Sequence, residues 1–239
     1  MKTIKILGVT ITSEKEDYIL EYLFARIKTN AEKTFIITPN PEMLVYASKH
    51  LDYQDKLNHA NIALPDGVGL FFASGLMGER LEERITGVDF MEKLCEACRE
   101  KPLSIGFLGG RGRVAERTAE RLKMRYPWIN VTFVGSEWSE KGFINKKERS
   151  IDILFVAYGI PKQEEWIYEN LPKLPVKAAM GVGGAFDFIS GAVPRALFLV
   201  RFLGLEWLFR LIVQPWRFRR QLALIEFIFL VFKEWFREK

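Results

Sequence analysis

Residues 153–182 read ILFVAYGIPKQEEWIYENLPKLPVKAAMGV and contain a complete unit of strand, turn, helix and strand. The run Ile153–Ala157 is continuously apolar, which is typical of a parallel strand covered by helices on both faces. Helical spacing follows over Pro161–Asn170, and a second apolar strand is predicted over Ala178–Val182. Strands that alternate with helices in this way predict an open, mostly parallel sheet.

The same alternation extends back to the N-terminus. Further strands are predicted over Thr3–Ile11, Thr34–Ile37, Ile62–Leu64, Ser104–Leu108 and Val131–Val134. Helices are predicted after the capping box Ser13/Glu16, after Asn40-Pro41, and over Arg113–Arg125. We therefore predict an α/β, Rossmann-like fold with helices on both faces of a mostly parallel sheet. Its body would span residues 1–191, and residues 192–239 would form a helical, membrane-binding appendage.

One connection is short for this architecture. Between Val134 and Ile153 there is little room for a helix, and Lys141–Ser150 has no apolar face. A parallel connection usually needs a dozen or more residues. The crossover is therefore either irregular or lacks a segment.

Composition limits the class of protein. The 239 residues are 49% hydrophobic and 27% charged, which suits a folded domain, alone or with an appendage. No apolar run approaches the roughly 20 residues that span a bilayer, and Met1–Ile4 leads directly into a strand without a signal peptide. We expect a protein of the cytosol or of the cytosolic side of a membrane. Cys95 and Cys98, inside a helical pattern, are expected to be reduced thiols in or near the core.

The positive charge is concentrated at the C-terminus. Residues 195–239 contain nine Lys or Arg and four Asp or Glu, and the rest of the chain is balanced, so the whole net charge of +5 lies there. Leu, Phe, Ile, Val and Trp stand between these arginines, which suits a lipid interface better than nucleic acid. One helix is predicted to end before Pro215 and another to run from Trp216 to Glu238, with Arg217 and Arg220 on one face. The alternatives are a helix pair packed on the body or a dimer interface.

Glycine-rich and polar turns follow the predicted strands, and ligands of such sheets bind beyond the carboxyl ends of the strands. The turn Gly109-Gly110-Arg111-Gly112 precedes a helix, so it suits either a diphosphate or tight packing, and the sequence alone does not decide between them. A nicotinamide dehydrogenase would need G-x-G-x-x-G and a following acidic residue. Glu137 is a loose candidate for that acid, but the glycine spacing does not fit.

Asp66 is the candidate catalytic carboxylate. It follows the apolar stretch Asn61–Leu64 and precedes Gly67, so a pocket at the strand tip could raise its pKa and suit it as a general base. The alternative is an aspartate that caps the next helix. Arg84 could bind an anion or pair with Glu82 or Glu83. The chain has no D-x-D, histidine cluster or Walker lysine, so no metal or ATP motif is visible, and arginines are the expected partners of a leaving diphosphate.

Seven blocks in fixed order give a specific resemblance. They are Thr38–Glu42, Leu64–Gly67, Arg84 with Thr86–Asp89, Phe107–Gly110, Pro161–Glu164, Gly181–Asp187, and Gly204–Trp207 with the arginines after it. Together they cover nearly the whole chain, which resembles the bacterial WecG/TagA/CpsF glycosyltransferase family and its teichoic-acid branch in particular. The chain departs from the family at Leu197, where a proline is common.

The resemblance implies an inverting, metal-independent enzyme without a cofactor. Such an enzyme would transfer N-acetylmannosamine from UDP-N-acetylmannosamine to the 4-hydroxyl of N-acetylglucosamine on undecaprenyl diphosphate, in the synthesis of the wall teichoic acid linkage unit. It would lie on the cytoplasmic face of the membrane as a peripheral protein, with an anionic membrane surface as partner, no nucleic acid, and a second copy of the chain as a further candidate partner.

The resemblance also implies roles for individual residues. Asp66 would be the general base, and Thr38, Asn40, Arg84 and Gln163 would line the pocket. Asp187, Gly109 and Gly110 would lie where the nucleotide binds, and Arg210, Arg217 and Arg220 would close over the diphosphate. Three alternatives remain open: another UDP-sugar donor such as N-acetylmannosaminuronic acid, a non-catalytic nucleotide-sugar or lipid-binding protein, and an NAD-dependent oxidoreductase.

Overall fold

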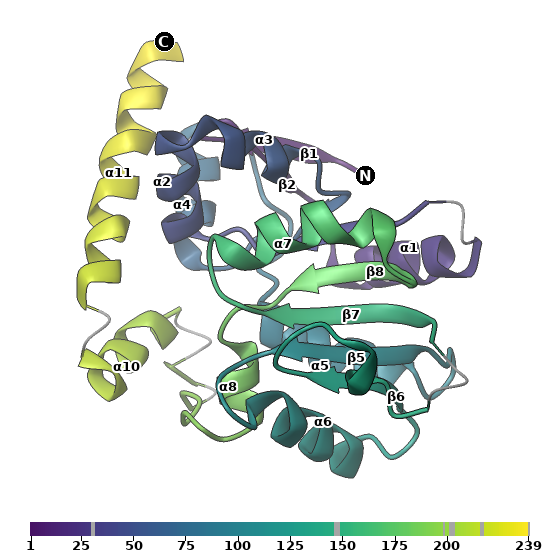
Figure 1. Cartoon of the computed structure of the whole chain (residues 1–239). Helices are drawn as coiled ribbons and strands as arrows, with labels where there is room; N and C mark the ends of the chain where they lie inside the picture. The colour runs from purple at the N-terminus through teal and green to yellow at the C-terminus, as the bar shows by residue number, and fades with distance from the viewer. Residues whose placement is uncertain (30–31, 146–148, 198, 201–203, 216–217, 239) are drawn as a thin grey trace.

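The computed structural model has three layers, with a central parallel sheet between two layers of helices (Figure 1). It describes residues 1–29, 32–145, 149–197, 199–200, 204–215 and 218–238, with only the backbone for residues 219–221 and 238. The sheet has the strand order β4-β3-β8-β7-β5-β6, and every pairing in it is parallel. Its strands are β3 (Thr34–Ile37), β4 (Ile62–Ala63), β5 (Ser104–Gly109), β6 (Asn130–Gly135), β7 (Ile151–Ala157) and β8 (Val176–Gly181). The predicted α/β class with a parallel sheet is confirmed.

Neighbouring residues in the middle of the central strands belong to two separate cores, one on each face of the sheet. In β7, Ile153 and Phe155 join one core, while Leu154 and Val156 join the other, as the period of two in a strand requires. The first core is covered by α1 (Glu16–Thr29), α5 (Gly87–Ala97), α6 (Val114–Arg125) and α8 (Ala185–Ile189). The second is covered by α2 (Pro41–Lys49), α3 (Leu51–Asn58), α4 (Val68–Leu76), α7 (Lys162–Asn170) and α11 (Phe218–Glu238).

The N-terminal segment differs from its prediction. Thr3–Ile11 was expected to form one strand of the main sheet, but it forms a separate antiparallel hairpin of β1 (Thr3–Ile6) and β2 (Val9–Thr12). Leu7 and Gly8 both have positive φ, 47° and 78°, which is the conformation of a two-residue hairpin turn. The glycine in the middle of the apolar run was the signal for this turn.

The short crossover from β6 to β7 is irregular. Its described residues contain only a 3₁₀ turn, Glu140–Gly142, in place of a helix. Phe143 makes an isolated bridge to Phe133, and Trp138 stacks on the Phe133 ring with centroids 4.7 Å apart. These aromatic rings cover the edge of the sheet where a crossover helix would otherwise pack.

The two cysteines behave as predicted. Cys95 and Cys98 are free and buried in the core at the end of α5. Burial raises the pKa of both thiols, that of Cys98 to about 11, so neither is an activated nucleophile.

The C-terminal residues form α10 (Glu206–Val213) and α11, and α11 lies along α2 and α4 at one side of the molecule (Figure 1). Its inner face is fixed to the body: Phe227 and Val231 are fully buried, and Glu226 pairs with Lys49 at 2.7 Å. Its opposite face exposes a stripe of apolar side chains, namely Phe218, Leu222, Ile225, Phe229, Phe232 and Phe236. Within the described ranges, no helix has the length and apolarity needed to cross a bilayer.

Because α11 has one buried and one exposed face, the same kind of substitution should have a large effect on stability on one face and a small effect on the other. Phe227→Ala should lower the free energy of unfolding by about 3 kcal/mol, because it leaves a cavity against α2 and α4. Phe229→Ala, at a side chain that is 67% exposed on the same helix, should change it by less than about 0.5 kcal/mol. Urea unfolding of both variants measures the difference. Equal effects would show that α11 does not dock on the body in solution.

Candidate active site

A cavity of about 1120 Å³ opens at the edge of the sheet where the strands end. Because all strands of the sheet are parallel, the turns that follow them meet at this edge. Most of the predicted site residues line the cavity: Thr38, Asn40, Asp66, Arg84, Gly110, Gln163, Asp187 and Arg210. Gly109 is not among the lining residues, Arg217 lies outside the described residues, and the structure describes only the backbone of Arg220.

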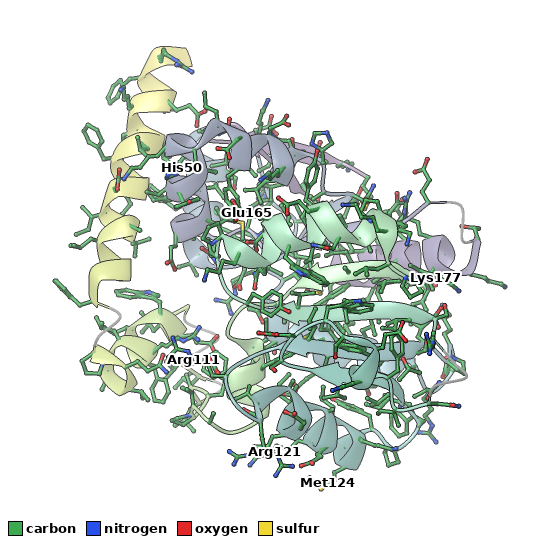
Figure 2. All side chains as sticks on the ribbon, viewed as in Figure 1. His50, Arg111, Arg121, Met124, Glu165 and Lys177 are labelled. Atoms are coloured by element: carbon green, nitrogen blue, oxygen red, sulfur yellow. The ribbon has the colours of Figure 1, made fainter. Side chains whose placement is uncertain are left out.

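The first two glycines of the turn after β5 have different roles: Gly109 permits close packing, and Gly110 lines the cavity. Gly109 has a φ of 104°, and a Cβ there would come within 2.9 Å of the Ala157 carbonyl oxygen, so this glycine allows β5 and β7 to approach. Gly110 lines the cavity, as does Arg111, which extends from the turn on the α10 side of the molecule (Figure 2). The helix that follows, α6, has no side-chain cap, and its first N–H, that of Val114, donates to the Arg111 carbonyl at 3.3 Å.

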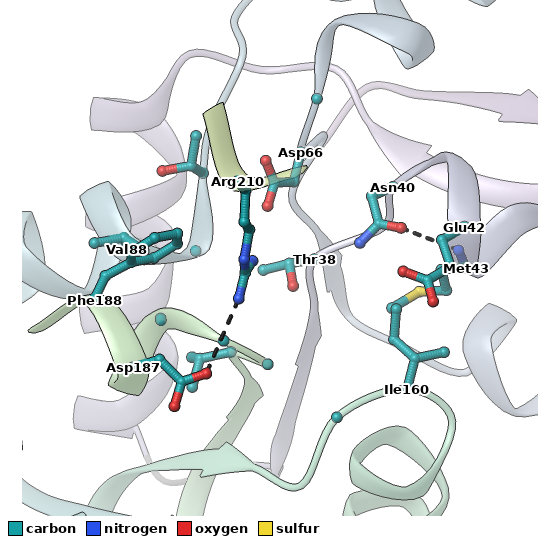
Figure 3. Close-up of a pocket in the computed structure, with 18 of the residues that line it drawn as sticks. Thr38, Asn40, Glu42, Met43, Asp66, Val88, Ile160, Asp187, Phe188 and Arg210 are labelled. Carbon is teal, nitrogen blue, oxygen red and sulfur yellow. Dashed lines mark hydrogen bonds and ion pairs between the residues drawn. The ribbon is translucent and has the colours of Figure 1, made fainter. Parts of the chain in front are cut away.

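Asp66 stands at the tip of β4 with its carboxyl group facing the cavity beside Arg210 (Figure 3). Its backbone N–H donates to the Pro39 carbonyl at 2.9 Å, which fixes it next to the turn after β3. The alternative role as a helix cap is wrong, because α4 has Gly67 as its N-cap and no side-chain capping bond. Burial, reinforced by the carboxylates of Glu206 and Asp89, raises the pKa of Asp66 to about 7 despite the nearby Arg84 and Arg210.

Glu206 belongs to α10, and an ion-pair cluster holds that helix at the rim of the cavity. Arg195 Nη2 contacts Asp89 Oδ1 of α5 at 2.6 Å, and its Nε lies 3.6 Å from Glu206 Oε1. Thr86 caps α5 and donates its hydroxyl to the other oxygen of Asp89 at 2.6 Å. The cluster therefore ties α10 to the body through Glu206, whose carboxylate contributes to the raised pKa of Asp66.

Arg210 extends from α10 into the cavity between Asp66 and Asp187 (Figure 3). Its Nη2 lies 4.0 Å from Asp187 Oδ2, and its guanidinium stacks 4.6 Å from the centroid of the Phe188 ring. A Cβ on Gly184 would come within 2.1 Å of Nη2, so the guanidinium lies directly on the glycine turn after β8. This turn is where the sequence predicts the nucleotide.

Three of the polar residues predicted for the site also hold its walls together. Thr38 donates its hydroxyl to the Gly181 carbonyl at 3.0 Å and so links β3 to β8. Asn40 accepts from Met43 N at 3.0 Å as the predicted cap of α2, and its amide nitrogen points into the cavity (Figure 3). Gln163, which is buried, accepts from the backbone N–H groups of the turns after β7 and β8.

Several lining residues were not among the predicted site residues: Arg111, Lys162, Tyr158, Glu206, Trp207 and Gln214. Arg111 lies in the turn Gly109–Gly112, Lys162 in Pro161–Glu164, and Glu206 and Trp207 in Gly204–Trp207, so the sequence carried a signal for these four residues. Tyr158 directly follows the predicted strand Ile153–Ala157. No sequence pattern predicted that Gln214 would line the cavity, because its position depends on how α10 packs.

Charged groups of both signs line the cavity, and the carboxyl groups are those of Glu42, Asp66, Asp187 and Glu206. Arg84, Arg111, Lys162 and Arg210 all line it, and guanidinium groups bind phosphate oxygens in a bidentate manner. Over the part of the chain that the structure describes, no three His, Cys, Asp or Glu side chains gather in a way that could hold a metal ion.

Known proteins resemble this chain along nearly its whole length. Residues 4–239 match the glycosyl transferase WecG/TagA/CpsF family. A protein of Bacillus subtilis (strain 168) named N-acetylglucosaminyldiphosphoundecaprenol N-acetyl-beta-D-mannosaminyltransferase is 31% identical over 237 residues, or 98% of this chain and 93% of that protein. Proteins of the same name from Bacillus spizizenii and Staphylococcus aureus (strain MRSA252) are 36% and 30% identical, over 83% and 96% of this chain and 79% and 92% of their own.

The raised pKa of Asp66 predicts a pH-dependent effect of Asp66→Asn on stability. Between the ordinary carboxyl pKa of 3.8 and the value of about 7, the unfolded chain releases the Asp66 proton while the folded protein retains it, so the wild type loses stability as pH rises. The stability of the variant relative to wild type should therefore increase by up to about 4 kcal/mol from pH 4 to pH 8. Urea unfolding at both pH values measures this difference, and a pH-independent effect would contradict the raised pKa.

Proposed function

Because the chain belongs to the WecG/TagA/CpsF glycosyltransferase family, we propose that it transfers N-acetylmannosamine from UDP-N-acetylmannosamine to the 4-hydroxyl of N-acetylglucosamine on undecaprenyl diphosphate. The names of its relatives in Bacillus and Staphylococcus support this acceptor and this sugar. The product would serve as an early intermediate of the wall teichoic acid linkage unit. The observation that carries the proposal is the carboxyl group of Asp66, whose pKa is raised to about 7, in a cavity that Arg84, Arg111 and Arg210 also line.

In the proposed reaction Asp66 acts as the general base. A carboxylate whose pKa lies near neutral pH can remove a proton from a hydroxyl group at the working pH, as general-base catalysis requires. The 4-hydroxyl oxygen would form a bond to C1 of the donor sugar as the bond from C1 to the UDP oxygen breaks, and the proton would pass to Asp66. Attack from the face opposite UDP inverts the configuration at C1.

The leaving UDP would be stabilised by cationic groups of the protein in place of a metal ion. Arg210 lies on the turn after β8, within 4.0 Å of Asp187, so a small rotation would direct its guanidinium to a diphosphate bound there. Arg111 and the start of α6 stand at the neighbouring turn after β5. Arg217 and Arg220 follow in the sequence and would complete the closure.

The acceptor is an amphiphile, and the exposed face of α11 would bring the cavity to the membrane that contains it. The stripe that includes Phe218, Ile225 and Phe229 is apolar, and the surrounding tail carries the positive charge of the chain. Both features favour binding of an amphipathic helix to an anionic bilayer surface. The enzyme would therefore act as a peripheral protein on the cytoplasmic face.

A donor screen tests the proposal. The protein is incubated with N-acetylglucosaminyl-diphospho-undecaprenol in anionic vesicles and with UDP-N-acetylmannosamine, its uronic acid form or UDP-N-acetylglucosamine, and the lipid product is read by mass. Addition of one N-acetylhexosamine only with the first donor is expected. Product only with the uronic acid form would identify that UDP-sugar as the donor. Binding of UDP without any product would favour the non-catalytic alternative. Binding of NAD but not UDP would favour an oxidoreductase.

Asp66→Asn should abolish transfer and retain donor binding. The amide cannot accept the proton of the acceptor hydroxyl, so we expect a loss in kcat on the order of 10³-fold or more. Donor affinity, measured by calorimetry, should change little because the cationic groups stay in place. Full activity of this variant would remove Asp66 from the role of base.

Arg210→Gln should weaken both UDP binding and transfer. Loss of a charged donor to the departing diphosphate is expected to lower kcat/KM on the order of 10²-fold. Arg121→Gln is the matched control, because Arg121 lies on α6 away from α10 and the cavity (Figure 2). Equal, small effects of the two changes would mean that α10 does not contribute to the reaction.

A further inference from the structure

Glu164 is a buried carboxyl group on α7 that the proposed reaction does not use. Its side chain is completely inaccessible to solvent. Tyr53 of α3 donates its hydroxyl to Oε2 at 2.9 Å, and Gln163 donates its Nε2 to Oε1 at 2.6 Å. Burial raises the pKa of Glu164 to about 7, while these two hydrogen bonds act in the opposite direction because they stabilise the charged form.

The other end of the Gln163 amide links two walls of the cavity. Its Oε1 accepts from Gly159 N at 3.1 Å and from Gly183 N at 3.0 Å. Gly159 belongs to the turn after β7 and Gly183 to the turn after β8, and both line the cavity. One side-chain oxygen thus determines how closely these two turns approach each other.

This link requires one orientation of the amide. A rotation of 180° would place the NH₂ group against two backbone N–H donors and leave both without an acceptor, which is costly in a buried site. The two orientations have nearly the same shape, so packing does not choose between them. Hydrogen bonds at both ends of the amide choose: the two backbone N–H groups require an oxygen at one end, and Glu164 Oε1, which accepts from Nε2, requires the NH₂ group at the other.

We infer that Glu164 is a positioning residue of the active site: its carboxylate holds the Gln163 amide in the orientation that joins the turns after β7 and β8. The pair packs against Gly181, where a Cβ would lie 3.0 Å from Gln163 Nε2 and 3.2 Å from Glu164 Oε1, so β8 leaves space for this contact. Thr38 donates to the carbonyl of the same glycine, and the arrangement thereby reaches the turn after β3. The effect on turnover rests on the proposed function, whereas the effect on the two turns does not.

Substitutions at Glu164 separate this role from packing and from charge. Glu164→Met removes the acceptor, so the amides of Gly159 and Gly183 should exchange hydrogen on the order of ten-fold faster. Glu164→Gln can still accept from Gln163 while its own NH₂ group donates to the Tyr53 hydroxyl, so it should retain most of the protection. A packing role predicts equal results for these two variants of similar volume, and a role of the charge itself predicts that both fail.

The measurement is hydrogen exchange of the free protein with mass detection, read over peptides that cover residues 158–163 and 182–185. Glu165→Gln on the same helix is the control and should leave both peptides unchanged. If Glu164→Met does not fold, Glu164→Asp takes its place, because it retains the charge but withdraws the oxygen by one methylene and should loosen the same peptides. Wild-type protection in Glu164→Met or Glu164→Asp, or equal loss in Glu164→Gln, would overturn the inference.

Transfer kinetics provide a second reading. Looser turns should raise KM for the UDP-sugar by on the order of ten-fold in Glu164→Met and change kcat less, with recovery in Glu164→Gln. Failure of the wild-type enzyme to transfer any sugar would refute the proposed function and leave the exchange experiment valid. Normal KM with increased exchange would show that the two turns do not bind the donor, and would overturn the assignment of Glu164 to the active site.

Discussion

The parallel pairing of β7 with β8 and with β5 is the constraint on which the rest of the molecule depends. Parallel strands end at one edge, so the turns after β5, β7 and β8 are neighbours there although they are far apart in the chain. Each of these turns contains a glycine with positive φ, namely Gly109, Gly159 and Gly183. The backbone can therefore turn sharply at each strand end. The N–H groups of Gly159 and Gly183 point toward each other's turn and are both bound by Gln163 Oε1.

The polar residues of the site also form hydrogen bonds that connect these turns to one another. Thr38 joins β3 to β8, Gln163 joins the turns after β7 and β8, and Asp66 is fixed by its hydrogen bond to the turn after β3. Substrate-facing groups held in this way lose little conformational freedom when a ligand binds.

The sequence predicted most of the sheet, and most of the site residues that it predicted line the cavity, because both rest on local patterns. Apolar runs marked the strands of the main sheet, and Asn40-Pro41 marked the start of α2 correctly. The hairpin was missed because Val9–Thr12 continues the apolar pattern of the first strand, and a turn of two residues interrupts it only at Gly8. The separation of Gly109 from Gly110 could not be predicted, since it depends on how closely β5 approaches β7. The contributions of Glu206 and Gln214 likewise depend on where α10 docks, which no local pattern encodes.

The position of Glu206 on α10, and not on the body, has a consequence for the acidity of the site. The cover over Asp66 and part of the negative potential around it come from a helix held by the contacts of Arg195. If that helix swung away, water would reach the Asp66 carboxyl and Glu206 would leave with the helix, so both main causes of its high proton affinity would weaken together. The pKa of Asp66 therefore depends on the seating of a distant C-terminal segment, and in an uncovered cleft it would fall toward the ordinary value of an aspartate.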